Sequence, residues 1–225
     1  MLIKNNLNKI LETVPGDVTL VAVSKTKPIS DIQEVYDAGH KVFGENKVQE
    51  MVQKYEALPK DIEWHMIGHL QRNKVKYMAP FVSLIHGVDS FKTLKEIDKQ
   101  AKKNNRIIPC LLEAKIAQED TKFGLSFAEI EEILTSDAFK ELKNIQISGL
   151  MGMASYTDDK EQIAKEFRSL KNFFEKLKKE LPKIENINFT TLSMGMSGDY
   201  KIALANGSNM IRVGSAIFGA RNYIA

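Results

Sequence analysis

The sequence predicts an α/β fold, a single (β/α)8 barrel, on three observations. Short β-branched apolar runs alternate with helical patterns, eight such strand–helix pairs follow a leading helix, and no linker or change of composition divides the 225 residues. Strands that alternate with helices form parallel βαβ units, and eight units in a chain of this length lie near the lower size limit of the closed barrel. We therefore expect residues 1–225 to form one domain.

An open doubly wound sheet is the alternative architecture. Such a sheet usually carries a glycine-rich phosphate loop after its first strand. In this chain the corresponding place holds Ser24-Lys25-Thr26-Lys27-Pro28, which contains no glycine. The barrel is therefore favoured.

Each element follows from its own segment, beginning with an amphipathic helix at 1–10. The expected strands lie at 19–25, 41–45, 63–67, 82–86, 107–114, 145–151, 189–192 and 210–213. These runs show little alternation of apolar and polar residues, which is typical of strands buried on both faces of a parallel sheet. The expected helices lie at 30–38, 46–57, 74–78, 90–104, 126–135, 158–179, 199–205 and 216–219. Ser30 is the expected N-cap of the helix at 30–38, and Gly39 is its expected C′ glycine.

Composition and charge exclude several classes of protein. Apolar residues make up 43% and charged residues 27%, which is typical of a soluble globular domain and not of a disordered chain. The 32 basic and 29 acidic residues are interspersed, so charge gives no case for nucleic-acid binding. No apolar run approaches the roughly 18 residues of a membrane span. Cys110 is the sole cysteine, which rules out a disulfide within the chain and fits a reducing, cytoplasmic location.

The first candidate for chemistry is Lys25, because function in such barrels lies at the carboxyl ends of the strands. Side chains two positions apart on a strand point to the same face, so Lys25 shares a face with Val21 and Val23. A lysine on an apolar face is costly unless its charge is paired or lost, and a neutral amine can form a Schiff base. Two alternatives stay open. Either Lys25 follows the end of the strand and is solvated, or the reactive lysine is Lys27, which lies two positions further on and would share its face.

Two neighbouring loops at the same end of the barrel predict a phosphate site. The seventh strand leads to Ser193 and Ser197, and the eighth leads from Arg212 to Gly214 and Ser215. Backbone N–H groups and hydroxyls in such loops bind phosphate, and barrels often do so after strands 7 and 8. The alternative is that the glycines only make tight turns. A reactive lysine opposite a phosphate site suggests pyridoxal 5′-phosphate (PLP), which carries an aldehyde and a phosphate.

A metal site is not expected. His40, His65, His69 and His86 are scattered and lack the spacings of metal ligands. We expect His65 to be a hydrogen-bonded core residue and His69 to lie in a loop near the barrel mouth. His86 is expected to end the fourth strand. Cys110, in an apolar run, is expected to be an inert buried thiol.

Seven segments, in order along nearly the whole chain, resemble the pyridoxal phosphate homeostasis proteins. They are VAVSKTKP (21–28), FGENKVQE (43–50), WHMIGHLQRNK (64–74), DTKFGL (120–125), GLMGMASYTDD (149–159), LSMGMSGDY (192–200) and IRVGSAIFGAR (211–221). The resemblance implies a single barrel similar to the N-terminal domain of alanine racemase. It also implies a protein that binds PLP, has no established catalytic activity, and helps to keep free PLP in balance.

The resemblance assigns roles to individual residues. Lys25 would hold the cofactor as an aldimine, Asn46 would lie beside its ring, and Arg212 would face its pyridine nitrogen. The phosphate would be held by Ser193, Ser197, Gly214 and Ser215. Lys122 matches a family lysine near the mouth that has been suggested to help transfer of the cofactor. The sequence departs from the family at Lys115, where relatives commonly have asparagine, and a second cation there would alter that wall of the pocket.

Two features favour binding over catalysis. Arg212 is always protonated, so it cannot keep the pyridine nitrogen protonated as a carboxylate would. In alanine racemase the second base is a tyrosine from outside the barrel, and this chain stops at Ala225, directly after the barrel. Tyr156 and Tyr200 are the tyrosines expected nearest the mouth.

We therefore expect a PLP-binding homeostasis protein without turnover. We expect it to be a monomer that meets apo-enzymes transiently and has neither nucleic-acid nor membrane partners. The alternatives are a PLP-dependent amino acid racemase of narrow specificity and a barrel for sugar-phosphate chemistry in which no Schiff base forms.

Overall fold

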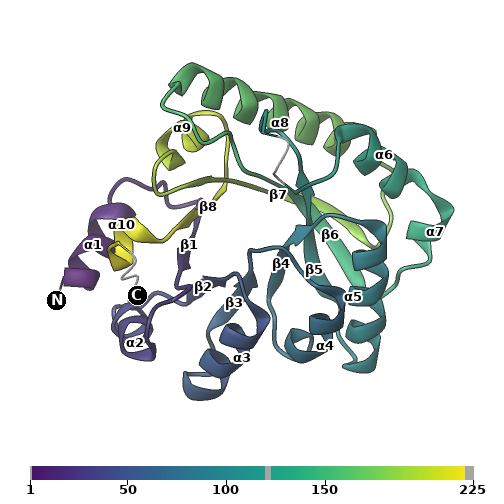
Figure 1. Ribbon diagram of the computed structural model, residues 1–225. Coiled ribbons are helices and arrows are strands. Elements are labelled where there is room, and N and C mark those ends of the chain that lie inside the picture. The colour runs from purple at the N-terminus through teal and green to yellow at the C-terminus, as the bar shows by residue number, and fades with distance from the viewer. Residues whose placement is uncertain (1, 120–122, 221–225) are drawn as a thin grey trace.

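The predicted barrel is confirmed by a computed structural model, which describes residues 2–119 and 123–220. Within these ranges, eight parallel strands adjoin in chain order, from β1 to β8. The ring closes where β1 pairs with β8, with Thr19 opposite Met210. Figure 1 shows the helices arranged around the outside of the strands. Closure excludes the open doubly wound sheet.

The elements match the predicted ones closely. The strands are β1 (Thr19–Val23), β2 (Val42–Glu45), β3 (Glu63–Met66), β4 (Leu84–Val88), β5 (Ile108–Ala114), β6 (Ile145–Gly152), β7 (Ile187–Met196) and β8 (Met210–Val213). The helices are α1 (Leu2–Leu11), α2 (Ile29–Asp37), α3 (Val48–Ala57), α4 (Val75–Met78), α5 (Phe91–Lys103), α6 (Phe127–Thr135), α7 (Asp137–Lys140), α8 (Lys160–Glu180), α9 (Tyr200–Ala205) and α10 (Ser215–Phe218), with a 3-10 turn η1 (Arg72–Lys74) before α4. Apart from the end of β7, every predicted boundary lies within two residues of the observed one.

The structure corrects some of these predictions. Strand β7 continues to Met196, four residues beyond the predicted end at 192, because Ser193 and Met196 still pair with β8. The one-turn helix α7 was not predicted, since it is too short to show a helical period. It begins where the Ser136 hydroxyl accepts a hydrogen bond from Phe139 N.

Smaller corrections concern three residues near the early strands. Helix α2 is capped at Pro28 and not at Ser30, whose hydroxyl lies near Asp31 instead. Gly39, with φ of +97°, does end that helix in the left-handed region. His86 lies inside β4 and does not end it.

Two apolar layers hold the barrel together. The larger one lies between the strands and the helices and contains the fully buried Phe43 and Trp64, whose ring centroids are 5.9 Å apart. The smaller one fills the barrel interior. It consists of Val21, Leu84, Leu111, Met151 and Met210. Burial of such side chains is the main stabilising contribution to a fold of this kind.

The interior residues also position the site. Side chains two positions apart on a strand share a face. Along β5, the interior Leu111 is therefore followed by Glu113 on the same face, and along β8 Met210 is followed by Arg212. The inward faces thus become polar at the carboxyl end of the barrel. In residues 2–119 and 123–220, no helix combines the length and apolar character needed to cross a membrane.

Candidate functional site

A cavity of about 530 Å³ opens at the carboxyl ends of the strands. Its volume lies in the range of small-molecule sites. Six of the seven predicted binding residues line it: Lys25, Asn46, Ser197, Arg212, Gly214 and Ser215. The sequence therefore locates the cavity correctly, although these residues come from four different strand ends.

Lys25 lies in the turn that follows β1, half-buried and lining the cavity. The rival Lys27 also reaches the cavity, but its Nζ donates to the carbonyl oxygens of Phe218, Gly219 and Ala220, at 3.0, 3.2 and 3.1 Å. These three contacts fix the Lys27 amine against the backbone at the end of α10. Lys27 thus has a structural role at the end of α10, and Lys25 stays the predicted reactive lysine.

The two glycine–serine loops converge on one position. The Ser197 hydroxyl, after β7, accepts hydrogen bonds from Gly214 N at 3.1 Å and Ala216 N at 3.5 Å, after β8. A Cβ atom built at Gly198 would meet nothing within 4 Å, so the loop leaves open space beside it. Backbone N–H groups that point to a single oxygen are suited to bind an anion. A phosphate oxygen could accept the same hydrogen bonds.

Ser193, the seventh predicted binding residue, is not a lining residue of the cavity. It is fully buried within β7, and its Oγ accepts a hydrogen bond from Arg212 Nη1 at 2.6 Å. The prediction treated Ser193 as a loop residue because β7 was expected to end one residue earlier. In the structure its direct partner is the arginine, not the converging loops.

Arg212 belongs to a buried polar chain beneath the cavity. Its Nη2 donates to Gly152 O at 3.1 Å. Ser193 Oγ lies 3.2 Å from His86 Nδ1, and His86 Nε2 lies 3.0 Å from His65 Nδ1. Burial lowers the pKa of His65 to about 3 and that of His86 well below its usual value, so both rings are neutral. The hydrogen bonds can then run in one direction, with Arg212 donating to Ser193, Ser193 to His86 and His86 to His65.

Burial lowers the pKa of Arg212 to about 10, which leaves the guanidinium charged at neutral pH. Because two acceptors fix its plane, the arginine presents a rigid positive charge to the cavity. His65 is a hydrogen-bonded core residue, as predicted.

Sequence reasoning missed Glu113. Its side chain lines the cavity, and burial, together with the nearby charge of Asp89, raises its pKa to about 7, against the opposing effect of Arg212. The sequence does carry a signal for Glu113: it is an acidic residue in an otherwise apolar strand, on the same face as the interior Leu111.

His69 lines the mouth, as predicted. Its Nδ1 lies 2.9 Å from Asp89 Oδ2, and its ring stacks on Phe123 with centroids 4.4 Å apart. His69, Phe123 and Glu113 together form one wall of the cavity.

The remaining predicted residues lie at different distances from the cavity. Tyr156 lines the mouth and is 98% exposed, whereas Tyr200 is buried with its hydroxyl 3.1 Å from Thr13 Oγ1. Lys115 is exposed and flanks a small hollow that it shares with Glu113. Lys122 lies outside the described residues. Cys110 is fully buried, which raises its thiol pKa, as expected of an inert thiol.

The fold and this cavity together define a protein of the alanine racemase N-terminal barrel class. The family described as "Alanine racemase, N-terminal domain" matches residues 2–222. An alanine racemase of Clostridium difficile shares the fold, with a TM-score of 0.78 at 12% identity, over 99% of this chain and 58% of its own.

Two relatives are much more similar in sequence. A "Pyridoxal phosphate homeostasis protein" of Aquifex aeolicus is 40% identical over 205 residues, which cover 91% of this chain and 87% of the relative. PipY of Synechococcus elongatus PCC7942 is 34% identical without PLP and 33% identical with PLP bound, with TM-scores of 0.90 and 0.86. Both PipY structures cover 96% of this chain and 100% of their own. The chain belongs to the family of pyridoxal phosphate homeostasis proteins, as its motifs predicted.

Proposed function

We propose that this protein binds PLP in the cavity, holds it covalently through Lys25 and takes part in PLP homeostasis without catalytic turnover. The observation that carries the proposal is the placement of Lys25 and the converging loops of Ser197 and Gly214 around one cavity. Further support comes from the relatives, which are named for PLP homeostasis or were solved with PLP bound.

The residues of the cavity fit each part of PLP. The amine of Lys25 suits the aldehyde, and the N–H groups and hydroxyls of Ser197, Gly214 and Ser215 suit the phosphate. Arg212 suits the unprotonated pyridine nitrogen, to which it can donate. The amide oxygen of Asn46 is buried and has no hydrogen-bond partner within residues 2–119 and 123–220, which suits it to face the ring of bound PLP.

Covalent attachment requires Lys25 in its neutral form. The Lys25 nitrogen would be joined to the aldehyde carbon by a C=N bond in place of the C=O bond, and the oxygen would leave as water with both amine protons. The resulting aldimine is reversible, because water can attack the same carbon again. A carrier needs this reversibility, since the cofactor must leave for an apo-enzyme.

The charge of Arg212 argues for binding without turnover. When bound, PLP can supply an electron sink, but this requires a protonated ring nitrogen, and a permanent cation disfavours that proton. The protein would therefore hold the cofactor without strongly activating bound amino acids.

An amino acid racemase of narrow specificity is the second candidate function. It is favoured by Glu113, whose pKa near 7 suits a general acid or base, and by the His69–Asp89 pair in the same cavity. A racemase would exchange the α-proton of its substrate with solvent. No exchange in deuterated water with any common amino acid would exclude it, and exchange that is lost in Lys25→Ala would overturn the proposal of a carrier.

An absorbance titration tests PLP binding. We expect wild-type protein to develop the visible band of a lysine aldimine on addition of PLP, and Lys25→Ala to develop none. If wild type shows no band, both PLP hypotheses fail and the sugar-phosphate barrel becomes the better interpretation.

The cellular role rests on further proposals. We propose that the carrier is a cytoplasmic monomer that releases PLP to apo-enzymes during transient encounters. Light scattering coupled to size exclusion tests the monomer. Activation of a PLP-dependent apo-enzyme by loaded protein, at a rate above that of spontaneous release, tests the encounter.

A further inference from the structure

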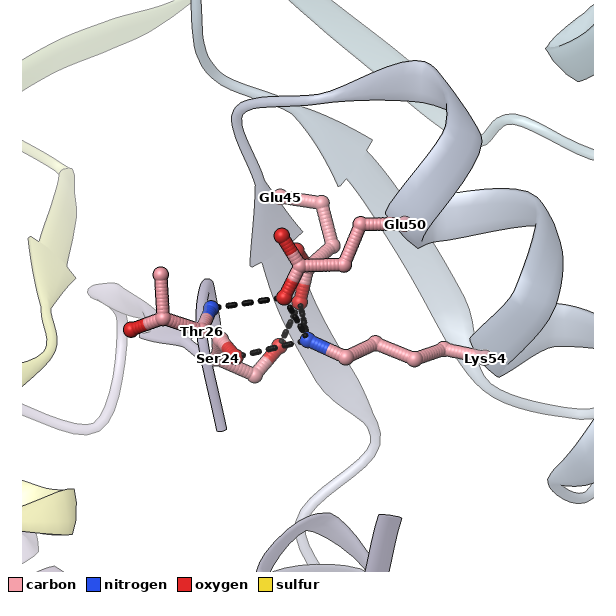
Figure 2. Close-up of polar contacts among 5 residues, drawn as sticks. All are labelled: Ser24, Thr26, Glu45, Glu50 and Lys54. Carbon is pink, nitrogen blue, oxygen red and sulfur yellow. Dashed lines mark hydrogen bonds and ion pairs between the residues drawn. The ribbon is translucent and has the colours of Figure 1, made fainter. Parts of the chain in front are cut away.

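A buried cluster of charges joins the turn that carries Lys25 to strand β2 and helix α3 (Figure 2). We call Glu45, Glu50 and Lys54 the anchor cluster. Lys54 Nζ lies 2.7 Å from Oε1 of Glu45 and 2.7 Å from Oε1 of Glu50. Glu45 ends β2, and the other two residues lie one helical turn apart on α3. The cluster therefore ties β2 and α3 to the turn that follows β1.

The anchor cluster forms hydrogen bonds with the residues on both sides of Lys25. Lys54 Nζ donates to Ser24 O at 2.8 Å, and the Ser24 hydroxyl donates to Glu45 Oε1 at 2.6 Å. On the other side, Thr26 N donates to Glu50 Oε1 at 2.6 Å. Residues 24 and 26 are thus both fixed to the cluster, as Figure 2 shows. Lys25 lies between them in the sequence.

The backbone of Thr26 has a strained conformation that requires such hydrogen bonds. Its φ is +63°, in the left-handed region, which a β-branched residue rarely adopts. Strained conformations of this kind persist where the surrounding structure imposes them, and they cluster at functional sites. Two hydrogen bonds hold this turn: Thr26 N donates to the Glu50 carboxylate, and Lys27 N donates to Ser24 O at 3.0 Å.

Burial makes the anchor cluster costly for stability alone. The side chains of Glu45 and Lys54 are 0% and 5% exposed, and Glu50 is 22% exposed. A buried ion pair seldom stabilises a fold more than apolar residues of the same volume would, so its presence is better explained by what it orients.

We propose that Glu45, Glu50 and Lys54 are positioning residues that fix the turn around Lys25 and aim its amine at the aldehyde of a bound PLP. The inference rests on the proposed function. It predicts a specific defect, because a loose turn would weaken covalent attachment but leave the converging loops and Arg212 able to bind the phosphate and the ring.

The experiment compares two ligands that differ at one group. PLP and 4′-deoxypyridoxine 5′-phosphate share the ring and the phosphate, but the analogue has a methyl group where PLP has the aldehyde. The ratio of their dissociation constants therefore measures the contribution of attachment to Lys25. In Lys25→Ala this ratio gives the baseline without attachment.

We expect Glu50→Ala to reduce the preference for PLP by about tenfold or more, because misplacement of a reacting group by about 1 Å can cost about a hundredfold. Its affinity for the analogue should stay within about twofold of wild type. Glu50→Gln, which keeps an oxygen able to accept from Thr26 N, should retain most of the preference. The matched control is Glu56→Ala, on the exposed side of the same helix, which should change neither affinity.

Several outcomes would overturn the inference. One is an unchanged preference for PLP in folded Glu50→Ala, and another is an equal loss of affinity for both ligands, which indicates a merely structural role. If Glu50→Ala does not fold, Ser24→Ala is the variant to measure, because it removes only the hydrogen bond to Glu45. An unchanged preference for PLP in Ser24→Ala would also overturn the inference. If wild type itself shows no preference for the aldehyde, the proposed function fails instead.

Discussion

At the scale of single residues, the role of a side chain depends more on its hydrogen-bond partners than on its position in the sequence. Lys25 and Lys27 both follow β1 and line the cavity, and Lys27 Nζ donates to three backbone carbonyl oxygens at the end of α10. Ser193 and Ser197 look alike in the sequence, but one lies under Arg212 and the other meets the N–H groups after β8. These differences depend on contacts across the barrel, which a single sequence does not display.

The two serines should therefore respond differently to alanine substitution. Ser193→Ala leaves Arg212 Nη1 without its acceptor, and we expect the free energy of unfolding to fall by about 1–3 kcal/mol, the cost of an unsatisfied buried group. Ser197→Ala should change stability little but weaken PLP binding. Urea denaturation and PLP titration of both variants measure the contrast, and equal stabilities would contradict the placement of Ser193.

Glu113 should make stability depend on pH. Its pKa of about 7 in the folded protein lies above its ordinary value of 4.5, so between these values the folded state binds more protons than the unfolded state. Its contribution to stability is therefore fully present below pH 4.5 and is lost as the pH rises through 7, by about 3 kcal/mol in total.

Replacement of Glu113 by glutamine tests this directly. We expect the stability of Glu113→Gln relative to wild type to increase between pH 4.5 and 7, and to stay level on either side. Chemical denaturation at intervals of pH measures it. A difference that does not vary with pH would show that this carboxyl titrates normally.

At the scale of elements, patterns along the chain predicted most of the structure. Long helices such as α5 and α8 show a clear period and a side-chain cap at Ser90 or Asp159, so their bounds were nearly correct. The end of β7 was missed because Ser193 and Gly195 interrupt the apolar run, and only pairing with β8 makes this segment a strand. Helix α7 has too few residues to show a period.

Helix α10 should depend on Lys27. The lysine side chain reaches from the β1–α2 connection to the carbonyl oxygens at the end of that short helix. We expect Lys27→Met to lower the free energy of unfolding by about 1–2 kcal/mol through loss of charge-assisted hydrogen bonds, and to leave attachment of PLP at Lys25 intact. Denaturation and PLP absorbance measure the two effects, with the exposed Lys103→Met as a control. Loss of the aldimine band in Lys27→Met would contradict the proposed division of roles.

At the scale of the whole molecule, eight strand–helix units bring distant residues to one mouth. The sequence predicted that mouth because the carboxyl ends of parallel strands share one edge. It did not predict the anchor cluster, because Ser24 and Lys54 are separated by 30 residues and meet only when β1, β2 and α3 have packed. The cavity was thus predictable from topology, whereas the contacts that tune its side chains were not.

The central claim is that the cavity holds PLP on Lys25. The most direct test is to load the protein with PLP, reduce it with borohydride and locate the pyridoxyl group by mass spectrometry of its peptides. We predict one dominant adduct on Lys25, in wild type and in Lys27→Met alike. A dominant adduct on Lys27, Lys122 or any other lysine, or no adduct at all, would contradict the claim.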